Sequence, residues 1–333
     1  MSTMFIAMFV SALLLLMLLA LGIIFGGPRE PAPMDSIYAP FKDIDYSLLP
    51  ILQRCHMRDR IALAYRCYPA QHPHPNGTRS IVFVHGSSAS SKSMHQLGLA
   101  FANAGYTAYT LDMRGHGASG EKGQVRYIGQ LEDDLADFMQ SMSIKGMVSL
   151  AGFSSGGGFV LRFAGSQRQH LFNNYLLLSP FISQTAASQR LDSGGWVKVG
   201  VPRVVALLIL NSFGIRWFNA LSITRFALNE EAKQYLTPSY GFNLAQNFRP
   251  MTDYRANIAA CKQTMSLLAG AEDEAFHADQ FAQIFASAGK PIPVEILPGL
   301  GHIALSVDPR GTQAAVAAVE KMYASASGNL EKP

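Results

Sequence analysis

The longest apolar stretch of the chain lies near its amino terminus. From Phe5 to Phe25 only Ser11 and Gly22 interrupt the apolar residues, and no charged residue occurs. A helix rises about 1.5 Å per residue, so this stretch reaches roughly 31 Å, enough to cross the ~30 Å hydrocarbon core of a bilayer. The pattern therefore predicts a transmembrane anchor over residues 1–27.

The alternative for this stretch is a secretory signal peptide that is cleaved from the mature protein. No Lys or Arg precedes the stretch, its length exceeds the ~7–15 residues of a signal core, and no A-x-A-like site follows it. These features favour a retained, single-pass anchor. Arg29 and Lys42 follow it, which by the positive-inside rule favours a cytoplasmic location for the remaining chain. The segment from Gly26 to Ala39 is rich in Pro and Gly, which predicts a tether over residues 28–48.

Beyond the tether, short apolar runs alternate with longer segments of helical spacing. This alternation predicts an α/β fold with a mostly parallel central sheet and helices on both faces, built from residues 49–182 and 251–327. An opening hairpin is expected at Leu52–His56 and Ile61–Arg66. The expected sheet strands are Ser80–Val84, Thr107–Leu111, Met147–Phe153, Tyr175–Leu178, Met265–Ala269 and Val294–Leu297.

Two segments of the chain need a separate interpretation. A helix is expected between Ile128 and Met142, and its acidic triplet Glu132-Asp133-Asp134 is interpreted as a solvated outer surface rather than a metal site. The regular alternation breaks at residues 183–250, which are long and apolar enough to form a helical cap. We expect this cap over the carboxyl ends of the strands, where open α/β sheets bind ligands.

The composition narrows the range of functions. With 49% hydrophobic and 15% charged residues, the chain is not mainly disordered. A net charge of +4, from 27 basic and 23 acidic residues, is too small for a nucleic-acid-binding surface. Three cysteines without a CxxC pair exclude a disulfide scaffold and a zinc site of that kind, and Cys55 and Cys67 are expected out of register in the opening hairpin. Free thiols suit a reducing compartment.

The pentapeptide Gly152-Phe153-Ser154-Ser155-Gly156 matches G-x-S-x-G. It follows an expected strand and precedes a helical segment over 157–164, which is the strand–turn–helix context of a serine nucleophile. Glycines two residues to either side leave room where the backbone crowds around Ser154. Ser155 lacks this framing, so Ser154 is the candidate nucleophile.

A serine hydroxyl needs a base, and the base needs a partner that fixes its tautomer. His302 follows the last expected strand and Asp273 follows the strand before it, so both lie at the same sheet edge as Ser154. The order Ser, Asp, His is the one expected for this topology. Rival acids for the role of Asp273 are Glu272, Glu274 and Asp279.

Backbone amides must also stabilise the developing oxyanion. The amide of Ser155, directly after the nucleophile, is one candidate, and the amide of Ser87 in His85-Gly86-Ser87 is the other. His85 itself is expected to brace its loop rather than act as a second base.

Five segments carry a resemblance to a known family, namely VFVHGSSAS (82–90), LDMRGHGASG (111–120), GFSSGG (152–157), LLAGAEDEAF (267–276) and LPGLGH (297–302). In this order they resemble the α/β-hydrolase family, and more narrowly its serine-aminopeptidase-like, monoacylglycerol-lipase or lysophospholipase branch. The likeness covers about residues 50–325 and leaves out the anchor. It implies Ser154 as nucleophile, Asp273 as acid and His302 as base, with oxyanion amides at Ser87 and Ser155.

Other motifs in the chain are weaker. Residues 115–120 fit G-x-G-x-x-G, but Glu121, Lys122 and Gly123 follow instead of an apolar helical face, so a dinucleotide site is not expected. Asn76-Gly77-Thr78 fits a glycosylation acceptor but follows Pro75 and is typical of a turn.

The resemblance also implies a reaction class. A serine at position 154 argues against the dehalogenases and epoxide hydrolases of the fold, which use an aspartate nucleophile. His85-Gly86-Ser87-Ser88 differs from the His-Gly-Gly-Pro-Gly loop of many peptidase members. We therefore expect a membrane-anchored serine hydrolase of carboxylic esters such as monoacylglycerols or lysophospholipids.

Some alternatives stay open. They are a thioesterase or peptidase of the same fold, and a non-catalytic, membrane-tethered binding module. The expected ligand is a small-molecule or lipid ester, and no cofactor, metal, nucleic acid or obligatory protein partner is expected.

Overall fold

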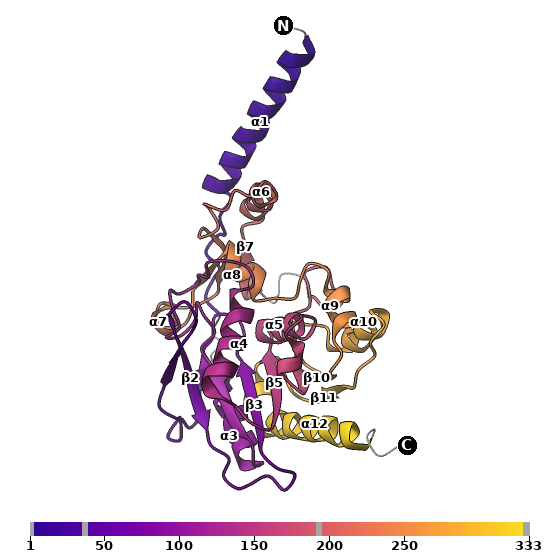
Figure 1. Cartoon of the computed structure of the whole chain (residues 1–333). Helices are drawn as coiled ribbons and strands as arrows, with labels where there is room; N and C mark the ends of the chain where they lie inside the picture. Colours follow the sequence, from indigo (N-terminus) through magenta and orange to yellow (C-terminus); the bar gives the residue numbers. More distant parts are fainter. Residues whose placement is uncertain (1–2, 35–38, 191–194, 329–333) are drawn as a thin grey trace.

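The structure is a computed structural model that describes residues 3–34, 39–190 and 195–328. Parts of the predicted tether (35–38) and of the predicted cap (191–194) lie outside the described residues. The chain folds around an eight-stranded sheet of order β1-β2-β4-β3-β5-β6-β10-β11 (Figure 1). The strands are β1 (Gln53–His56), β2 (Ala62–Tyr68), β3 (Arg79–Val84), β4 (Thr107–Leu111), β5 (Met147–Phe153), β6 (Asn174–Leu178), β10 (Thr264–Gly270) and β11 (Val294–Leu297).

The predicted sheet is confirmed. Every expected run forms a strand, with boundaries that differ by at most two residues. β1 and β2 form the antiparallel opening hairpin, β2 pairs antiparallel with β4, and all remaining neighbours are parallel. In the hairpin Cys55 pairs with Leu63 rather than with Cys67, and all three cysteines are free.

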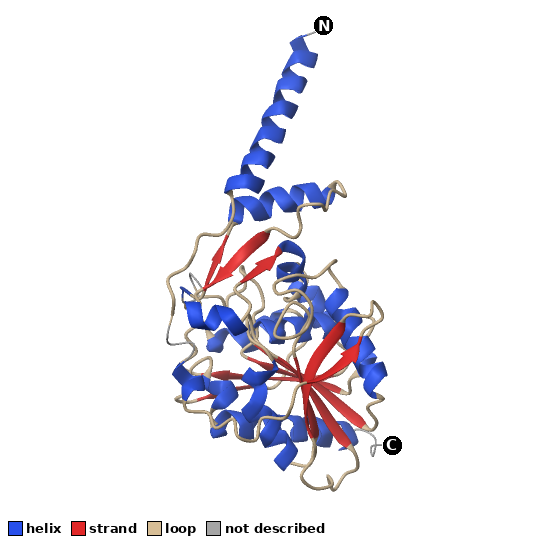
Figure 2. Ribbon diagram, turned by 90° about the vertical axis from the view of Figure 1, so that its left-hand side faces the viewer, coloured by secondary structure: helices blue, strands red, loops and turns tan. Residues whose placement is uncertain are grey.

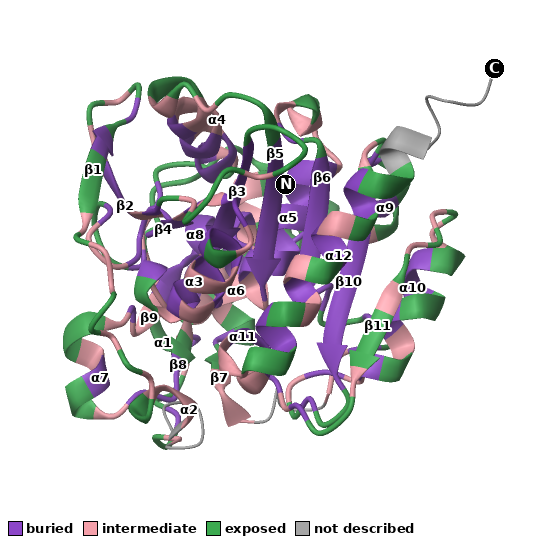
Figure 3. Ribbon diagram, turned by 90° about the horizontal axis from the view of Figure 1, so that it is seen from below, coloured by how far each residue is buried: buried purple, intermediate pink, exposed green. Residues whose placement is uncertain are grey.

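Helices cover both faces of the sheet, which is why its central strands are apolar on consecutive positions. On β3, Val82 and Val84 belong to one core, while Ile81 and Phe83 belong to the other. Figure 3 shows the buried strands between the two layers. One layer holds α3 (His95–Asn103), α11 (Ala304–Val307) and α12 (Pro309–Gly328), and the other holds α4 (Gln130–Met142), α5 (Ser155–Ala164), α9 (Tyr254–Ala260) and α10 (Phe281–Ser287). Short 3₁₀ turns occur at Ser91–Met94, Gln169–Leu171 and Ala278–Gln280.

The acidic triplet of α4 is not the solvated surface that was expected. Glu132 and Asp134 are buried, and each accepts hydrogen bonds from an arginine of another element. Arg162 Nε lies 2.5 Å from Glu132 Oε1, and Arg114 Nη2 lies 2.6 Å from Asp134 Oδ1. The expectation was wrong because buried carboxylates are tolerated when long cationic side chains pair with them, and those partners are distant in sequence. Among the described residues no group of three or more metal-ligating side chains occurs.

The cap differs from the predicted helical insertion. It contains a three-stranded antiparallel sheet of β7 (Val197–Val199), β8 (Ser222–Phe226) and β9 (Ser239–Gly241), with the helices α6 (Val201–Ser212), α7 (Glu230–Tyr235) and α8 (Phe242–Asn247). The helical expectation was thus correct only in part. Strands of 3–5 residues are too short to show a period of two in the sequence.

The amino-terminal helix α1 (Thr3–Phe25) projects from the body of the molecule (Figure 2). Its segment Met4–Phe25 is long and apolar enough to cross a membrane, and nearly all of it is exposed. α6 lies across the foot of α1 (Figure 2). The chain then runs over the cap, where the Met34 amide donates to the Ala227 carbonyl at 3.1 Å, and forms the short helix α2 (Ala39–Lys42).

Candidate active site

Ser154 lies on a sharp turn between β5 and α5. Its backbone has φ 55° and ψ −122°, a left-handed conformation that costs energy for a residue with a side chain. The flanking glycines make this turn possible. A Cβ on Gly152 would lie 2.4 Å from the Gly156 carbonyl oxygen, and one on Gly156 would lie 2.3 Å from the His85 carbonyl oxygen. The G-x-S-x-G pattern therefore has a steric cause.

Hydrogen bonds fix the turn from both sides. The Ser154 amide donates to the Leu178 carbonyl of β6 at 2.9 Å. Its carbonyl accepts from the amides of Gly158 and Phe181, each at 3.0 Å. The strained conformation is thus held by β6, by α5 and by the loop that leads into the cap, which together position the hydroxyl at the carboxyl edge of the sheet.

Asp273 and His302 meet at the same edge. His302 Nδ1 lies 2.9 Å from Asp273 Oδ2, and both side chains are buried. The other carboxylate oxygen, Oδ1, accepts from the amides of Ala275 and Phe276, each at 2.8 Å. Burial alone would raise the pKa of Asp273, but the charge and hydrogen bond of His302 outweigh it and hold that pKa below its usual range. An ionised Asp273 can orient the imidazole and stabilise its protonated form.

The rival acids occupy other positions. Glu274 Oε2 accepts the backbone amide of His302 at 2.8 Å, rather than touching the ring. Asp279 accepts from the side chain of Gln280, and Glu272 is exposed. Sequence reasoning missed the role of Glu274. Its only signal was an acid next to Asp273 in the same loop.

Two aromatic rings hold the imidazole in place. The ring of Phe153, the residue before the nucleophile, lies 4.7 Å from the His302 ring, and the ring of Phe276 lies 5.2 Å from it on an edge. Both distances are between ring centroids. Because Phe153 ends β5 and Phe276 follows β10, the packing links the base to the two strands that carry Ser154 and Asp273.

The two expected oxyanion donors lie beside each other. Ser87 Oγ is 2.5 Å from Ser155 Oγ, which brings the loop after β3 against the first turn of α5. A Cβ on Gly86 would lie 3.3 Å from the Ser154 Cβ, so the loop approaches the nucleophile closely. In the described part of the chain, neither the Ser87 amide nor the Ser155 amide donates to a protein acceptor. Both amides are therefore available to a ligand.

A buried histidine pair supports this loop. His85 Nδ1 lies 2.8 Å from the Gly86 carbonyl oxygen, and its Nε2 accepts from the Met113 amide at 3.2 Å. His116 Nε2 lies 2.6 Å from the hydroxyl of Tyr240, which accepts the Ser88 amide at 2.6 Å. Burial lowers the pKa of both histidines, so they stay neutral. They brace the loop, as expected for His85.

The G-x-G-x-x-G segment, residues 115–120, also helps to hold the loop after β3. Asp112 accepts the Ser91 amide at 2.7 Å and the Ala118 amide at 2.8 Å. A Cβ on Gly117 would lie 2.1 Å from Asp112 Oδ2, which explains that glycine. The next helix along the chain, α4, begins only at Gln130, so the helix that a dinucleotide motif requires does not start within this segment. The segment lacks the geometry of a dinucleotide site.

A cavity of about 930 Å³ lies between the sheet edge and the cap. Ser154, His302, Ser87 and Ser155 line its floor. Its other walls are largely apolar and come mainly from the cap and its junctions, including Phe181, Trp196, Val204, Leu208, Phe226 and Phe276. The cap thus encloses a largely apolar cavity over Ser154 and His302.

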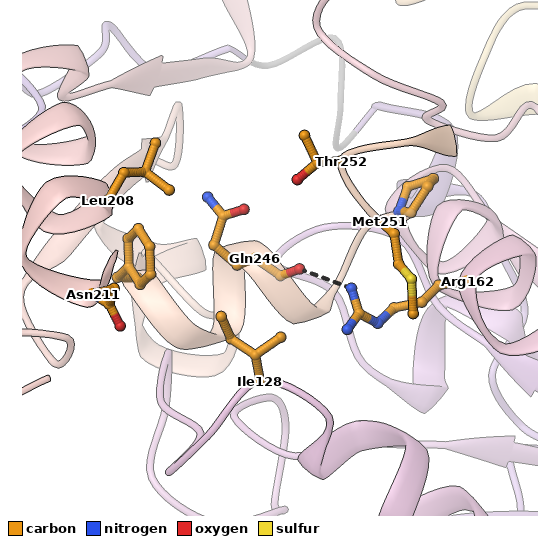
Figure 4. Close-up of a pocket in the computed structure, with 9 residues that line it drawn as sticks. Ile128, Arg162, Leu208, Asn211, Gln246, Met251 and Thr252 are labelled. Atoms are coloured by element: carbon orange, nitrogen blue, oxygen red, sulfur yellow. Dashed lines mark hydrogen bonds between the residues drawn. The ribbon is translucent and has the colours of Figure 1, made fainter. Parts of the chain in front are cut away.

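A smaller cavity of about 270 Å³ adjoins it (Figure 4). Leu208, Gln246 and Thr252 line both cavities, and Arg162 donates from Nη1 to the Gln246 carbonyl at 3.5 Å. The smaller cavity contains none of the sequence-predicted site residues.

Known proteins resemble large parts of this chain in sequence family and in fold. A family model described as serine aminopeptidase S33 matches residues 75–309, which include Ser154, Asp273 and His302. A curated protein of Synechocystis sp., named as a non-heme chloroperoxidase, is 32% identical over 100 residues. That match covers 30% of this chain and 36% of the relative, so the chain spans about a third of the relative's length.

Solved structures match this chain over a larger share of its length than the curated relative does. A membrane phospholipase A, described as a bacterial virulence factor, has a TM-score of 0.58 at 16% identity, over 95% of this chain and 93% of that one. A monoacylglycerol lipase of Paleococcus ferrophilus has a TM-score of 0.56 at 18% identity, over 78% of this chain and 98% of that one. At these identities the likeness shows a shared fold.

Proposed function

The chain belongs to the serine aminopeptidase S33 family of α/β-hydrolases, and on this premise we propose that it cleaves carboxylic esters with the triad Ser154, Asp273 and His302. The observation that carries the proposal is the 2.9 Å contact between His302 Nδ1 and Asp273 Oδ2, beside a strained Ser154 in the same cavity. A family name does not fix the bond that is cleaved, since one fold serves many reactions.

The reaction follows from these positions. Ser154 Oγ attacks the ester carbonyl while His302 Nε2 takes its proton, and the amides of Ser87 and Ser155 hold the oxyanion. The tetrahedral intermediate collapses to an acyl-enzyme, and the alcohol leaves with the proton from His302. Water, deprotonated by His302, then releases the acid and restores Ser154. Asp273 stays ionised throughout and holds the imidazole in the productive tautomer.

The cavity supports a lipid ester as substrate. Its walls are largely apolar, and its volume of about 930 Å³ lies near the upper end of small-molecule sites, which allows a long acyl chain. Two proteins of similar fold are named a membrane phospholipase A and a monoacylglycerol lipase. Monoacylglycerols, lysophospholipids and related lipid esters are the favoured class.

The remaining organisation is part of the proposal. Residues 1–27 anchor the chain in the membrane by a single span, 28–48 connect the anchor, 49–182 and 251–327 form the hydrolase core, and 183–250 form the cap. Arg29 and Lys42, which follow the span, favour a cytoplasmic hydrolase part. Anchoring raises the local concentration of amphipathic substrates around the cavity.

The test uses two adjacent serines. Ser154→Ala removes the nucleophile, and Ser155→Ala is the matched control because it keeps the backbone amide. With p-nitrophenyl esters of graded chain length, Ser154→Ala should lose roughly 10⁴-fold or more of kcat, while Ser155→Ala stays within about tenfold of wild type. Unchanged turnover in Ser154→Ala would contradict the proposal. Preference for long chains supports a lipid ester, whereas cleavage of only thioesters or peptides, or no turnover at all, would favour the alternatives.

A further inference from the structure

An exposed apolar surface lies at the foot of α1. We call it the foot surface, and it consists of the outer side of α6 and the loop that follows. Trp217 is 89% exposed and Phe213 is 75% exposed. Val205, Ile215 and Phe218 are also exposed. Clustered apolar exposure of this kind marks a binding surface, because soluble proteins rarely leave such a patch in water.

The foot surface is fixed to the anchor. A Cβ on Gly22 of α1 would lie 3.1 Å from the Ala206 Cβ and 3.1 Å from the Pro202 carbonyl oxygen, so the two helices touch through a glycine. Arg203 of α6 donates to the Ile23 carbonyl at 2.9 Å and to the Ile24 carbonyl at 3.2 Å. These are last-turn carbonyls of α1, where a cation is favourable. The position of α6 therefore follows that of α1.

The position of this junction along α1 indicates how deep in the membrane the foot surface would lie. Leu19 and Ile23 pack with Ala206 and Leu207 of α6, and the apolar segment of α1 ends at Phe25. Phe25 comes six positions after Leu19, which is about 9 Å at ~1.5 Å per residue. Helices that lie in a membrane interface are buried by about 5–10 Å. Because α6 crosses the foot of α1 (Figure 2), it would lie along the membrane plane at this depth.

The charge of this part of the cap suits an anionic membrane. Residues 195–229 include Lys198, Arg203, Arg216 and Arg225, and no Asp or Glu; of these, Arg225 pairs with Glu30 of the preceding segment. Arg216 is exposed between Ile215 and Trp217, so a cation and apolar side chains share one short loop. Basic residues beside an inserted apolar face add affinity for anionic headgroups.

The same helix walls the cavity. Val201 is 59% exposed and Leu208 is 50% exposed, yet both line the cavity that contains Ser154. Val204 lines it as well. An opening between exposed residues of α6 would therefore face the membrane rather than bulk water.

From these observations we infer that the foot surface is a second membrane contact, which lies in the headgroup region and presents the cavity opening to lipids of the same leaflet. The partner is an anionic lipid bilayer. This inference rests on the proposed function, since it requires both the anchor and a lipid ester substrate. A lipid would then enter the cavity sideways, without its acyl chain crossing bulk water, which avoids the cost of exposing that chain.

Tryptophan fluorescence tests the contact directly, because the chain has 2 tryptophans. Trp196→Phe leaves Trp217 as the sole tryptophan, and Trp217→Phe is the matched control that leaves the partly buried Trp196. The full chain is reconstituted in vesicles of phosphatidylcholine and phosphatidylglycerol whose acyl chains carry bromine at shallow positions. We expect brominated lipid to quench Trp217 severalfold more than Trp196. Quenching of Trp217 by aqueous iodide, with no effect of bromine, would overturn the inference.

A kinetic comparison separates this inference from the proposed function. In the double variant Phe213→Asp/Trp217→Asp, hydrolysis of a lipid ester in vesicles should fall about tenfold, while hydrolysis of soluble p-nitrophenyl butyrate stays unchanged. The double variant Phe213→Leu/Trp217→Phe should keep both activities. If the aspartates lowered hydrolysis of both substrates equally, the inferred membrane contact of the foot surface would be wrong. If the wild type cleaves neither ester, the proposed function fails, whereas the bromine quenching still tests the membrane contact.

Discussion

The carboxyl edge of the eight-stranded sheet and the foot of α1 differ in how their residues are held. At the sheet edge the acid and the base are buried, the serines are half-buried, and hydrogen bonds fix them, as in Asp273, which accepts from two amides and one imidazole. At the foot, large apolar side chains such as Trp217 are exposed, and the preceding helix α6 is held against α1. The first arrangement suits chemistry that needs fixed geometry, and the second suits contact with a fluid partner.

The comparison predicts that changes at the sheet edge lower turnover of every substrate, whereas changes at the foot lower turnover only of membrane-bound substrates. The largest effect is expected from Asp273→Asn. An asparagine can donate to His302 and so favour the wrong imidazole tautomer, which should lower kcat by roughly 10⁴-fold on soluble and vesicle substrates alike. Steady-state kinetics measures this loss. Glu272 is an exposed neighbour of Asp273, so the control Glu272→Gln should have the wild-type rate. A wild-type rate in Asp273→Asn would show that another residue has the role of the acid.

A smaller effect is expected at Glu274, which positions His302 through its backbone amide. Glu274→Ala removes the acceptor, and we expect kcat to fall about tenfold with little change in KM. Glu274→Gln retains an acceptor oxygen and should recover most of the rate. If the glutamine variant were as slow as the alanine variant, the carboxylate charge rather than the hydrogen bond would be the cause.

At the foot, Gly22→Leu should separate α1 from α6. A leucine side chain is crowded there, because a Cβ on Gly22 would already lie 3.1 Å from the Ala206 Cβ and from the Pro202 carbonyl oxygen. We expect vesicle hydrolysis to fall by about threefold, with p-nitrophenyl butyrate unaffected. Ala20→Leu, at an exposed position two residues earlier, is the control and should leave both rates unchanged. A loss on both substrates would show that the foot also supports the sheet edge.

The smallest effect concerns acid stability. The pKa of Asp273 is lower in the folded chain than its ordinary value of about 3.9, so folding stability gained from this group is present above that pH and is lost as the pH falls through the lower, folded pKa. Between about pH 5 and pH 2 the Tm of Asp273→Asn should therefore fall less than that of the wild type. Parallel losses in the two proteins would indicate that Asp273 titrates alike in both states.

The sheet and the candidate triad were predictable because each signal is local. A buried parallel strand is a run of apolar residues, and each candidate site residue follows such a strand within five residues, as Ser154, Asp273 and His302 do. The positions around Ser154 are constrained by the strained turn itself, which only glycines at 152 and 156 permit. The sequence pattern and the backbone geometry that requires it therefore lie within the same few residues.

Other features depend on partners that are distant in sequence. The cap strands are too short for a periodic signal and form only because they pair with each other. Glu132 and Asp134 looked solvated because their partners, Arg162 and Arg114, come from other elements. Likewise the contact of Glu274 with the His302 amide links two loops that follow different strands. None of these contacts can be predicted from the pattern of neighbouring residues in the sequence.

The most direct measurement maps the site of covalent modification. The full chain is treated with a fluorophosphonate, digested, and the adduct is located by mass spectrometry. We expect a single adduct on Ser154, absent in Ser154→Ala and strongly slowed in Asp273→Asn, because the reagent reacts only with a serine that a neighbouring base activates. An adduct on another serine, or none in wild-type protein that hydrolyses esters, would contradict Ser154 as the nucleophile.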